Sequence, residues 1–405
     1  MKLAINLAWC NRNLEQEYNK WLSICSSNNI KFVRIFLCSW GINALFDDKD
    51  IKLLENVIKN AYAKRMDVCL VINNFVDYNI NNYSDINNKM YSWKKNPYFK
   101  KYKNTKNFFK TIDVDYLSKI EHILNRMSKY KNIRYIEIMN EIDQIECPNK
   151  ILINWVNSLI KKLKIMFKDR YIYTCSVSNY ELFNMFSKKI NCYVDLHFYS
   201  FPYESAMENI EYIIKRHSIL YLGEYAKYSD SAYLNDINSK IYFASGLWAA
   251  YFYNLKYSPL HWWWQHLLNN KDYINIVNVY NILINKLGKV KKVENVNIKF
   301  KFISRNDNKL EKKKIKERLD TLIKHPLFIF NEFRNIKKFI KKKFSEKSKI
   351  ICRKILLYEK DVYYLECSND IIIEDNINKD KMIDLLSGIE KNYTKNISRG
   401  VYIIF

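Results

Sequence analysis

The sequence predicts an α/β fold in which a closed (β/α)8 TIM barrel is followed by a small C-terminal β-rich domain. Short apolar runs of strand length alternate with longer segments whose apolar residues recur at helical spacing. The short runs are apolar throughout, which is typical of parallel strands that are covered by helices on both faces. Eight such units within about 290 residues suit a closed barrel.

The expected strands are spread over the first part of the chain. They are residues 3–8, 32–37, 68–72, 133–139, 171–175, 193–197, 219–223 and 260–264. Between them, segments 50–62 and 151–167 show helical periodicity, the first behind Asp50 as the expected N-cap. An open doubly wound sheet is the rival arrangement, but no glycine-rich phosphate loop follows any strand. We expect the long connection 74–116, rich in Asn, Lys and Tyr, to form a flap over one side of the barrel mouth.

The alternation stops beyond Leu287, so we expect the barrel to span residues 1–288 and a second region to span 289–405. Residues 309–349 combine many lysines with an apolar stripe and predict a basic helical segment. Such a helix could lie on anionic lipid or touch nucleic acid, but we favour packing of the stripe with solvated lysines. Strand-like runs at 354–358, 362–366, 371–374 and 401–405 then predict the β-rich domain.

The chain is strongly basic, with 67 Lys+Arg against 42 Asp+Glu and a net charge of +25. Taken alone, this charge suggests an anionic partner. Gly (6) and Pro (5) are scarce while Lys, Asn, Ile and Tyr dominate, a pattern that a genome-wide compositional bias also produces. We therefore expect at most a weak anionic-surface contact through 309–349 and no specific nucleic-acid partner.

Nine cysteines are scattered without C-x-x-C spacing, which favours reduced and mostly buried thiols. The first residues lack a signal-peptide pattern and are needed as the first strand. No apolar stretch has the roughly 18 to 20 residues that a membrane span requires. These features predict a cytoplasmic protein.

Two glutamates, Glu141 and Glu224, each follow an expected strand where that strand meets its loop. Parallel barrels place their chemistry at these carboxyl ends. Retaining glycosidases need a carboxylic acid that protonates the leaving oxygen and a carboxylate that attacks the anomeric carbon, about 5 to 5.5 Å apart. Side chains from the fourth and seventh strands can converge on one sugar from two sides. The alternative is that both are polar loop residues after buried strands.

At these residues the chain resembles the glycoside hydrolases of clan A, the (β/α)8 families that include family 5 cellulases and mannanases. In that clan an Asn-Glu pair ends strand four and a lone Glu ends strand seven, matched here by Asn140-Glu141 and Glu224. The resemblance implies that Glu141 is the acid/base, that Glu224 is the nucleophile, and that Asn140 bonds the 2-hydroxyl of the sugar. Arg34, in the run Val-Arg-Ile, matches the arginine that holds the nucleophile ionised by charge and hydrogen bonds.

The resemblance extends to residues that would line the sugar site. His197 and Tyr199 match a His-x-Tyr arrangement near the carboxylates, and Trp263 is expected to stack on the reacting sugar. Trp40 is a further stacking candidate. Asn74 is a substrate-binding candidate where many relatives carry a histidine, a departure that leaves the substrate open.

We therefore predict a retaining β-glycoside hydrolase whose substrate is a carbohydrate and which needs no cofactor and no metal. No metal-ligand spacing, G-x-S-x-G motif or histidine cluster supports other chemistry. A transglycosidase would use the same residues. The alternative from another class is a catalytically degenerate barrel that binds glycan, a membrane surface or a polyanion.

Overall fold

The computed structural model describes residues 1–8, 14–84, 89–199, 205–228, 235–262, 264–302, 350–358, 360–375, 377 and 379–405. The chain forms two compact units, Met1–Val290 and Lys291–Phe405. The basic segment 309–349, on which the anionic-surface contact was predicted, lies outside the described residues.

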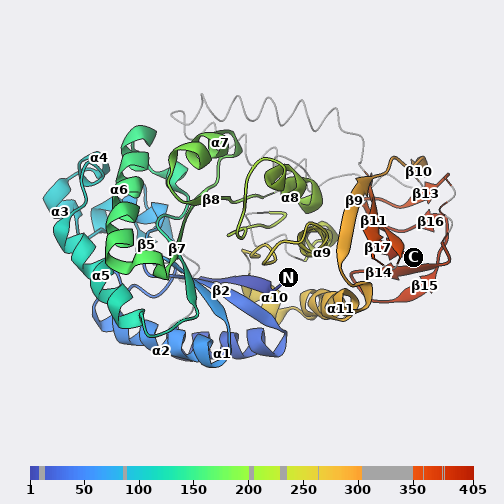
Figure 1. Cartoon of the computed structure of the whole chain (residues 1–405), viewed down its shortest axis with the longest axis horizontal. Coiled ribbons are helices and arrows are strands. Elements are labelled where there is room, and N and C mark those ends of the chain that lie inside the picture. Colours follow the sequence, from blue (N-terminus) through green and yellow to red (C-terminus); the bar gives the residue numbers. More distant parts are fainter. Residues whose placement is uncertain are drawn as a thin grey trace. The chain divides into compact units, whose positions relative to one another are not determined.

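The first unit is built on a curled parallel sheet of six strands in the order β1-β2-β3-β6-β7-β8 (Figure 1). The strands are β1 Leu3–Leu7, β2 Ile30–Phe36, β3 Asp67–Val71, β6 Ile133–Glu137, β7 Ile172–Val177 and β8 Tyr193–Leu196. All residues of β1 and β3 are buried, which explains their unbroken apolar runs. These six strands correspond to the first six runs predicted from the sequence.

Helices occupy the connections between and after the strands. They are α1 Leu14–Ser27, α2 Lys49–Ala63, α5 Val114–Met127, α6 Asn149–Phe167, α7 Tyr180–Lys189, α8 Ala206–Ile214, α9 Ile237–Phe252, α10 Trp264–Asn269 and α11 Lys271–Leu287. Side chains of Asp113 and Asn179 cap α5 and α7 by accepting backbone N–H groups. The N-cap predicted at Asp50 is wrong, because α2 begins at Lys49 and Asp50 lies in its first turn.

The sheet is not a closed eight-stranded barrel, so this part of the prediction is corrected. The described residues of the runs 219–223 and 260–264 form no strand; isolated parallel bridges join Phe198 to Tyr225, Tyr225 to His261 and His261 to Ile5. At Gly223 both backbone groups bond side chains, since its N–H donates to Asp195 and its carbonyl accepts from Asn6. The N–H of Gly223 is therefore not available for a strand ladder.

Aromatic side chains fill the inner face of the curled sheet. Phe32 on β2 stacks on Tyr257 with ring centroids 4.3 Å apart and contacts Tyr135 edge-on at 5.6 Å. Tyr221 lies in segment 219–223 and Tyr257 lies just before segment 260–264, and both side chains are buried. These segments therefore complete the core although they form no ladder.

The long connection after β3 has regular structure and an aromatic core of its own. It contains η1 Phe75–Tyr78, β4 Tyr83–Ser84, β5 Met90–Tyr91, η2 Trp93–Lys95, α3 Phe99–Tyr102 and α4 Thr105–Phe108. Phe108 lies 5.7 Å from Trp93 and 6.0 Å from Trp155 of α6, measured between ring centroids. The connection thus packs on the helices that follow it.

The second unit is β-rich and antiparallel. One sheet has the order β15-β14-β17-β12-β11-β9 and the other β10-β13-β16. The strands are β9 Val290–Asn295, β10 Phe300–Phe302, β11 Ile350–Leu357, β12 Asp361–Cys367, β13 Ile371–Ile373, β14 Lys381–Asp384, β15 Glu390–Asn392, β16 Asn396–Ile397 and β17 Gly400–Ile404. A core that includes Leu365, Met382 and Ile404 supports both sheets.

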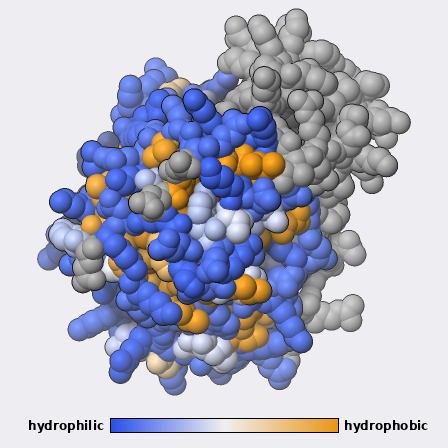
Figure 2. Space-filling model, turned by 90° about the vertical axis from the view of Figure 1, so that its right-hand side faces the viewer, coloured by the Kyte–Doolittle hydropathy of each residue, from blue (hydrophilic) through white to orange (hydrophobic). Residues whose placement is uncertain are grey.

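The surface is mostly hydrophilic on the face drawn in Figure 2, where hydrophobic residues form small separate groups. Among the described helices, none has the length and apolar character that crossing a membrane requires. Eight cysteines of the described residues are free thiols, and six of these are buried, as their scattered spacing predicted.

Candidate active site

Arg34, on β2, lies at the centre of the site and is fully buried. Its Nε and Nη2 atoms donate to the two carboxylate oxygens of Glu137 at 2.7 Å each, and Nη1 donates to Oε1 of Glu224 at 2.9 Å. It also donates to the side-chain oxygens of Asn6 at 3.1 Å and Asn140 at 2.7 Å. The rigid fork of an arginine suits this many fixed acceptors. Arg34 therefore joins two carboxylates and two amides into one network.

Glu137, at the end of β6, was missed by the sequence analysis. It is fully buried and also accepts hydrogen bonds from Ser176 at 2.8 Å and Tyr221 at 3.2 Å. One signal in the sequence could have identified it. Glu137 is a carboxylate in a mainly apolar run, and the expected buried arginine, Arg34, needs an acidic partner. A buried charge needs a partner, and Arg34 is that partner.

Glu141 leaves β6 through a strained backbone. Its φ of 50° lies in the left-handed region, which residues with a side chain adopt uncommonly. Its N–H donates to Oγ of Ser176 at 2.9 Å. The turn points the carboxylate toward His197, whose Nδ1 lies 3.0 Å from Oε1 of Glu141.

Glu224 is buried, with 2% of its surface exposed. Tyr199 donates its hydroxyl to Oε2 of Glu224 at 2.7 Å, while Arg34 holds Oε1. The backbone is fixed from both sides, since Phe198 N–H donates to the Glu224 carbonyl and Tyr225 N–H donates to a carbonyl of the neighbouring segment. Glu224 is thus rigidly placed although no strand carries it.

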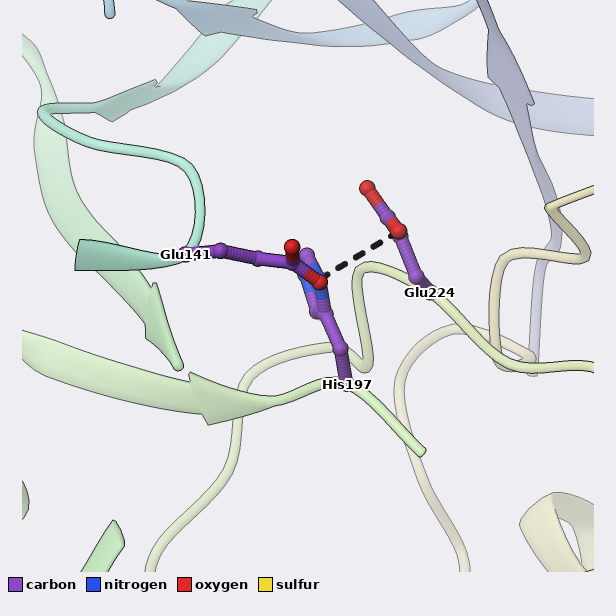
Figure 3. A group of neighbouring side chains, drawn as sticks. All are labelled: Glu141, His197 and Glu224. Carbon is purple, nitrogen blue, oxygen red and sulfur yellow. Dashed lines mark hydrogen bonds and ion pairs between the residues drawn. The ribbon is translucent and has the colours of Figure 1, made fainter. Parts of the chain in front are cut away.

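His197 contacts both carboxylates, and its ring lies beside the carboxylate of Glu141 in the view of Figure 3. Its Nδ1 lies 3.0 Å from Glu141 and 3.4 Å from Oε2 of Glu224. One donor atom from each of the three side chains lies within 4.8 Å of the other two, a grouping that could also surround a cation. Since the imidazole contacts both carboxylates, we assign the group to acid–base chemistry.

Asn140 and Asn74 form an amide chain beside Arg34. Asn140 accepts from Arg34 through Oδ1 and donates through Nδ2 to Oδ1 of Asn74 at 2.9 Å. Asn74 in turn donates to the backbone carbonyl of Ser39 at 3.4 Å. Both asparagines are fully buried, so each is held in one orientation.

Trp40 and Trp262 lie in an aromatic group that also contacts Tyr199. Trp40 has a left-handed φ of 70°, and its ring centroid lies 5.5 Å from that of Trp262 and 5.6 Å from that of Phe75. Trp40 and Tyr199 pack as partly buried residues against the cluster that contains Trp262. Trp263, the residue predicted to stack on the sugar, lies outside the described residues.

The charged groups of the site shift the pKa values of one another. Burial lowers the pKa of Arg34, but the charge and hydrogen bonds of Glu137 raise it well above its usual value. Burial raises the pKa of Glu137, and Arg34 overcomes this and holds it below its usual value. Burial raises the pKa of Glu224 and the Glu141 charge adds to this, while His197 and Arg34 oppose the rise. For His197, burial lowers the pKa, and the surrounding carboxylates raise it well above the usual range.

A hollow with a volume of about 610 Å³ lies along α6, away from the Arg34 network. It is lined by Asn157, Ser158, Ile160, Lys161, Lys164, Ile165 and Asn191. These lining residues include no carboxylate and no histidine. The chemistry of the chain therefore points to the Arg34 network instead.

The chain matches no family model and no curated protein sequence. Among solved structures it is similar to the endo-1,4-beta-mannanase from Rhizomucor miehei, with a TM-score of 0.46, 12% identity and coverage of 64% of this chain and 85% of that chain. It is also similar to the hyperthermostable endo-1,4-beta-D-mannanase from Thermotoga petrophila RKU-1, with a TM-score of 0.44, 12% identity and coverage of 64% and 87%. A third similar structure is a GH5_18 protein from Streptomyces cattleya in complex with Manb1-4GlcNAc, with a TM-score of 0.46, 10% identity and coverage of 65% and 71%.

Proposed function

We propose that the chain is a retaining glycoside hydrolase that cleaves a β-glycosidic bond by double displacement. The observation that carries the proposal is the pair Glu141 and Glu224, which have carboxylate oxygens within 4.8 Å of each other and share His197 between them. Retaining enzymes keep their carboxyl groups about 5 to 5.5 Å apart, whereas inverting enzymes leave about 6.5 to 9.5 Å for a water. The spacing here favours the retaining reaction.

In the first step Glu224 attacks the anomeric carbon, and the bond from that carbon to the leaving oxygen breaks. Glu141 gives its proton to the leaving oxygen. Arg34 and Tyr199 hold the two oxygens of Glu224, so the attacking carboxylate needs no reorientation. The product of this step is a glycosyl ester on Glu224 and a free alcohol.

In the second step water attacks the anomeric carbon of the ester while Glu141, now ionised, takes a proton from that water. The ester bond breaks and Glu224 regains its negative charge, which Arg34 again neutralises. Asn140, Asn74, Trp40 and Trp263 are the proposed contacts of the sugar. If an alcohol replaces water, the same residues carry out transglycosylation.

The test is chemical rescue of Glu224→Ala on an activated aryl β-glycoside. The variant should be inactive, and azide should restore turnover with a glycosyl azide of inverted anomeric configuration, because azide occupies the place of the missing carboxylate. The configuration of the wild-type product is read by proton NMR in the same experiment. Glu121→Ala, a change on α5, is the matched control and should retain full activity. An inverted wild-type product would rule out double displacement.

A further inference from the structure

Asp195, on β8, has no place in the reaction described above, although it touches two parts of the site. It is buried, and its Oδ2 accepts the N–H of Gly223, the residue before Glu224, at 2.6 Å. The same oxygen lies 3.5 Å from Nε2 of His197. Asp195 therefore lies on the side of the imidazole that faces away from Glu141 and Glu224.

The contact is built into the backbone at Gly223. A Cβ at this position would lie 2.4 Å from Oδ2 of Asp195 and 2.9 Å from Nε2 of His197. Any other residue would push the carboxylate and the imidazole away. A glycine here thus makes room for the pair, which is the kind of close approach that requires this residue.

The buried polar atoms of the pair have few other partners. Within the described part of the chain, neither Nε2 of His197 nor Oδ1 of Asp195 has a hydrogen bond. Unpaired buried polar groups are costly, and an Nε2–H group is the donor that faces the carboxylate. A proton on Nε2 therefore faces Oδ2 of Asp195, 3.5 Å away, the nearest acceptor that the ion pairs of the described residues give to this atom.

Charges approach His197 from every element packed around it. Glu141 and Glu137 come from the β6 side, Glu224 from segment 219–226, and Asp195 from β8. Arg34, on β2, is the opposing cation, and it is engaged by Glu137 and Glu224.

We propose that Asp195 is a positioning residue that keeps a proton on Nε2 of His197 and so holds the imidazole as a cation between Glu141 and Glu224. The Nδ1–H group then faces both carboxylates and offsets their mutual repulsion at the spacing the reaction uses. The pKa of His197 agrees with this geometry, since Glu224, Asp195 and Glu141 together raise it against the effect of burial. The catalytic consequence rests on the proposed function, whereas the protonation state of His197 does not.

The experiment is NMR of the full chain labelled with ¹⁵N in its six histidines, recorded between about pH 5 and pH 8, the range in which an ordinary histidine titrates. His197→Gln identifies the His197 signals. In the wild type, both nitrogens of His197 should remain protonated over the whole range. In Asp195→Asn, which keeps an acceptor for Gly223 but removes the charge, His197 should lose a proton within the range.

Asp143→Asn is the matched control, because Asp143 also accepts backbone N–H groups, those of Ser178 and Asn179, but makes no contact with His197 among the described interactions. It should leave the His197 signals unchanged. If Asp195→Asn does not fold, Asp195→Ser replaces it. A wild-type His197 with a bare Nε2 near neutral pH, or an Asp195→Asn variant that titrates like the wild type, would overturn the proposal.

The kinetic arm uses the pH profile of kcat/KM on the aryl glycoside. In Asp195→Asn the alkaline limb should shift from its wild-type position, because His197 loses its charge earlier and the carboxylates then face each other without a cation. An altered NMR titration in a chain without any glycosidase activity would uphold the proton placement and reject the proposed function. A normal profile together with a normal titration would reject the role of Asp195.

Discussion

The ion pair between Arg34 and Glu137 should dominate the stability of the first unit, and a double-mutant cycle can measure it. The changes are Arg34→Met, Glu137→Gln and the two together. Both side chains are completely buried, and Arg34 Nε lies 2.7 Å from Glu137. Arg34→Met leaves Glu137 and Glu224 as buried charges without their cation.

The structure gives the expected size. Removing one partner of a buried pair costs about 3 to 5 kcal/mol, because the other charge is left uncompensated. Each single variant should therefore lose about that much free energy of unfolding. The double variant should lose about 2 kcal/mol less than the sum, since no charge is left alone between these two positions, and couplings of this size are typical of contacting residues.

The assay is urea unfolding followed by tryptophan fluorescence. All nine tryptophans lie in residues 1–290, so the signal reports the first unit. The control is Arg126→Met, which breaks an ion pair with Glu55 in which the Arg126 side chain is 41% exposed. It should cost at most about 1 kcal/mol. Single effects that add without coupling, or an Arg34→Met variant as stable as the control, would refute this reasoning.

Three further predictions test other parts of the site. Tyr199→Phe removes the hydroxyl that lowers the pKa of Glu224, so the acidic limb of kcat/KM should move to higher pH and kcat should fall about 10-fold to 100-fold, as a pH-rate profile would show. Burial raises the pKa of Asp77 from 3.8 to about 7, so the free energy of unfolding should fall by about 4 kcal/mol as pH rises between these values; Asp77→Asn should flatten this dependence in urea titrations at several pH values. Gly246→Ala would place a Cβ 2.4 Å from the ring of Tyr225 and should cost about 1 to 3 kcal/mol in thermal unfolding, whereas an unchanged melting temperature would contradict the packing.

The sequence predicted the six strands β1 to β3 and β6 to β8 because each is a short, mainly apolar run. The prediction was wrong at 219–223 and 260–264. The local sequence of these runs is typical of strands, but contacts with distant residues determine their structure. The side chains that bond Gly223, Asn6 and Asp195, come from 217 and 28 residues away. Such contacts leave no local pattern in the sequence.

The same limit applies to the site. Arg34, Glu141 and Glu224 were predicted from their places in a recurring order of motifs. Glu137 was not predicted, because its partner Arg34 lies 103 residues away in the sequence. A single charge in an apolar run also forms no motif. The bend that aims Glu141 toward His197 depends on a left-handed backbone that composition does not show.

The measurement that decides whether this site hydrolyses glycosides is a panel of 4-nitrophenyl β-glycosides, assayed with the wild type, Glu224→Gln and Glu121→Gln side by side. Glu224→Gln keeps the shape of the side chain but removes the attacking charge. We expect the wild type and Glu121→Gln to release nitrophenol from at least one sugar, and Glu224→Gln to be slower by about 10⁴-fold or more. Equal rates for the wild type and Glu224→Gln would contradict the assignment of Glu224 as the nucleophile.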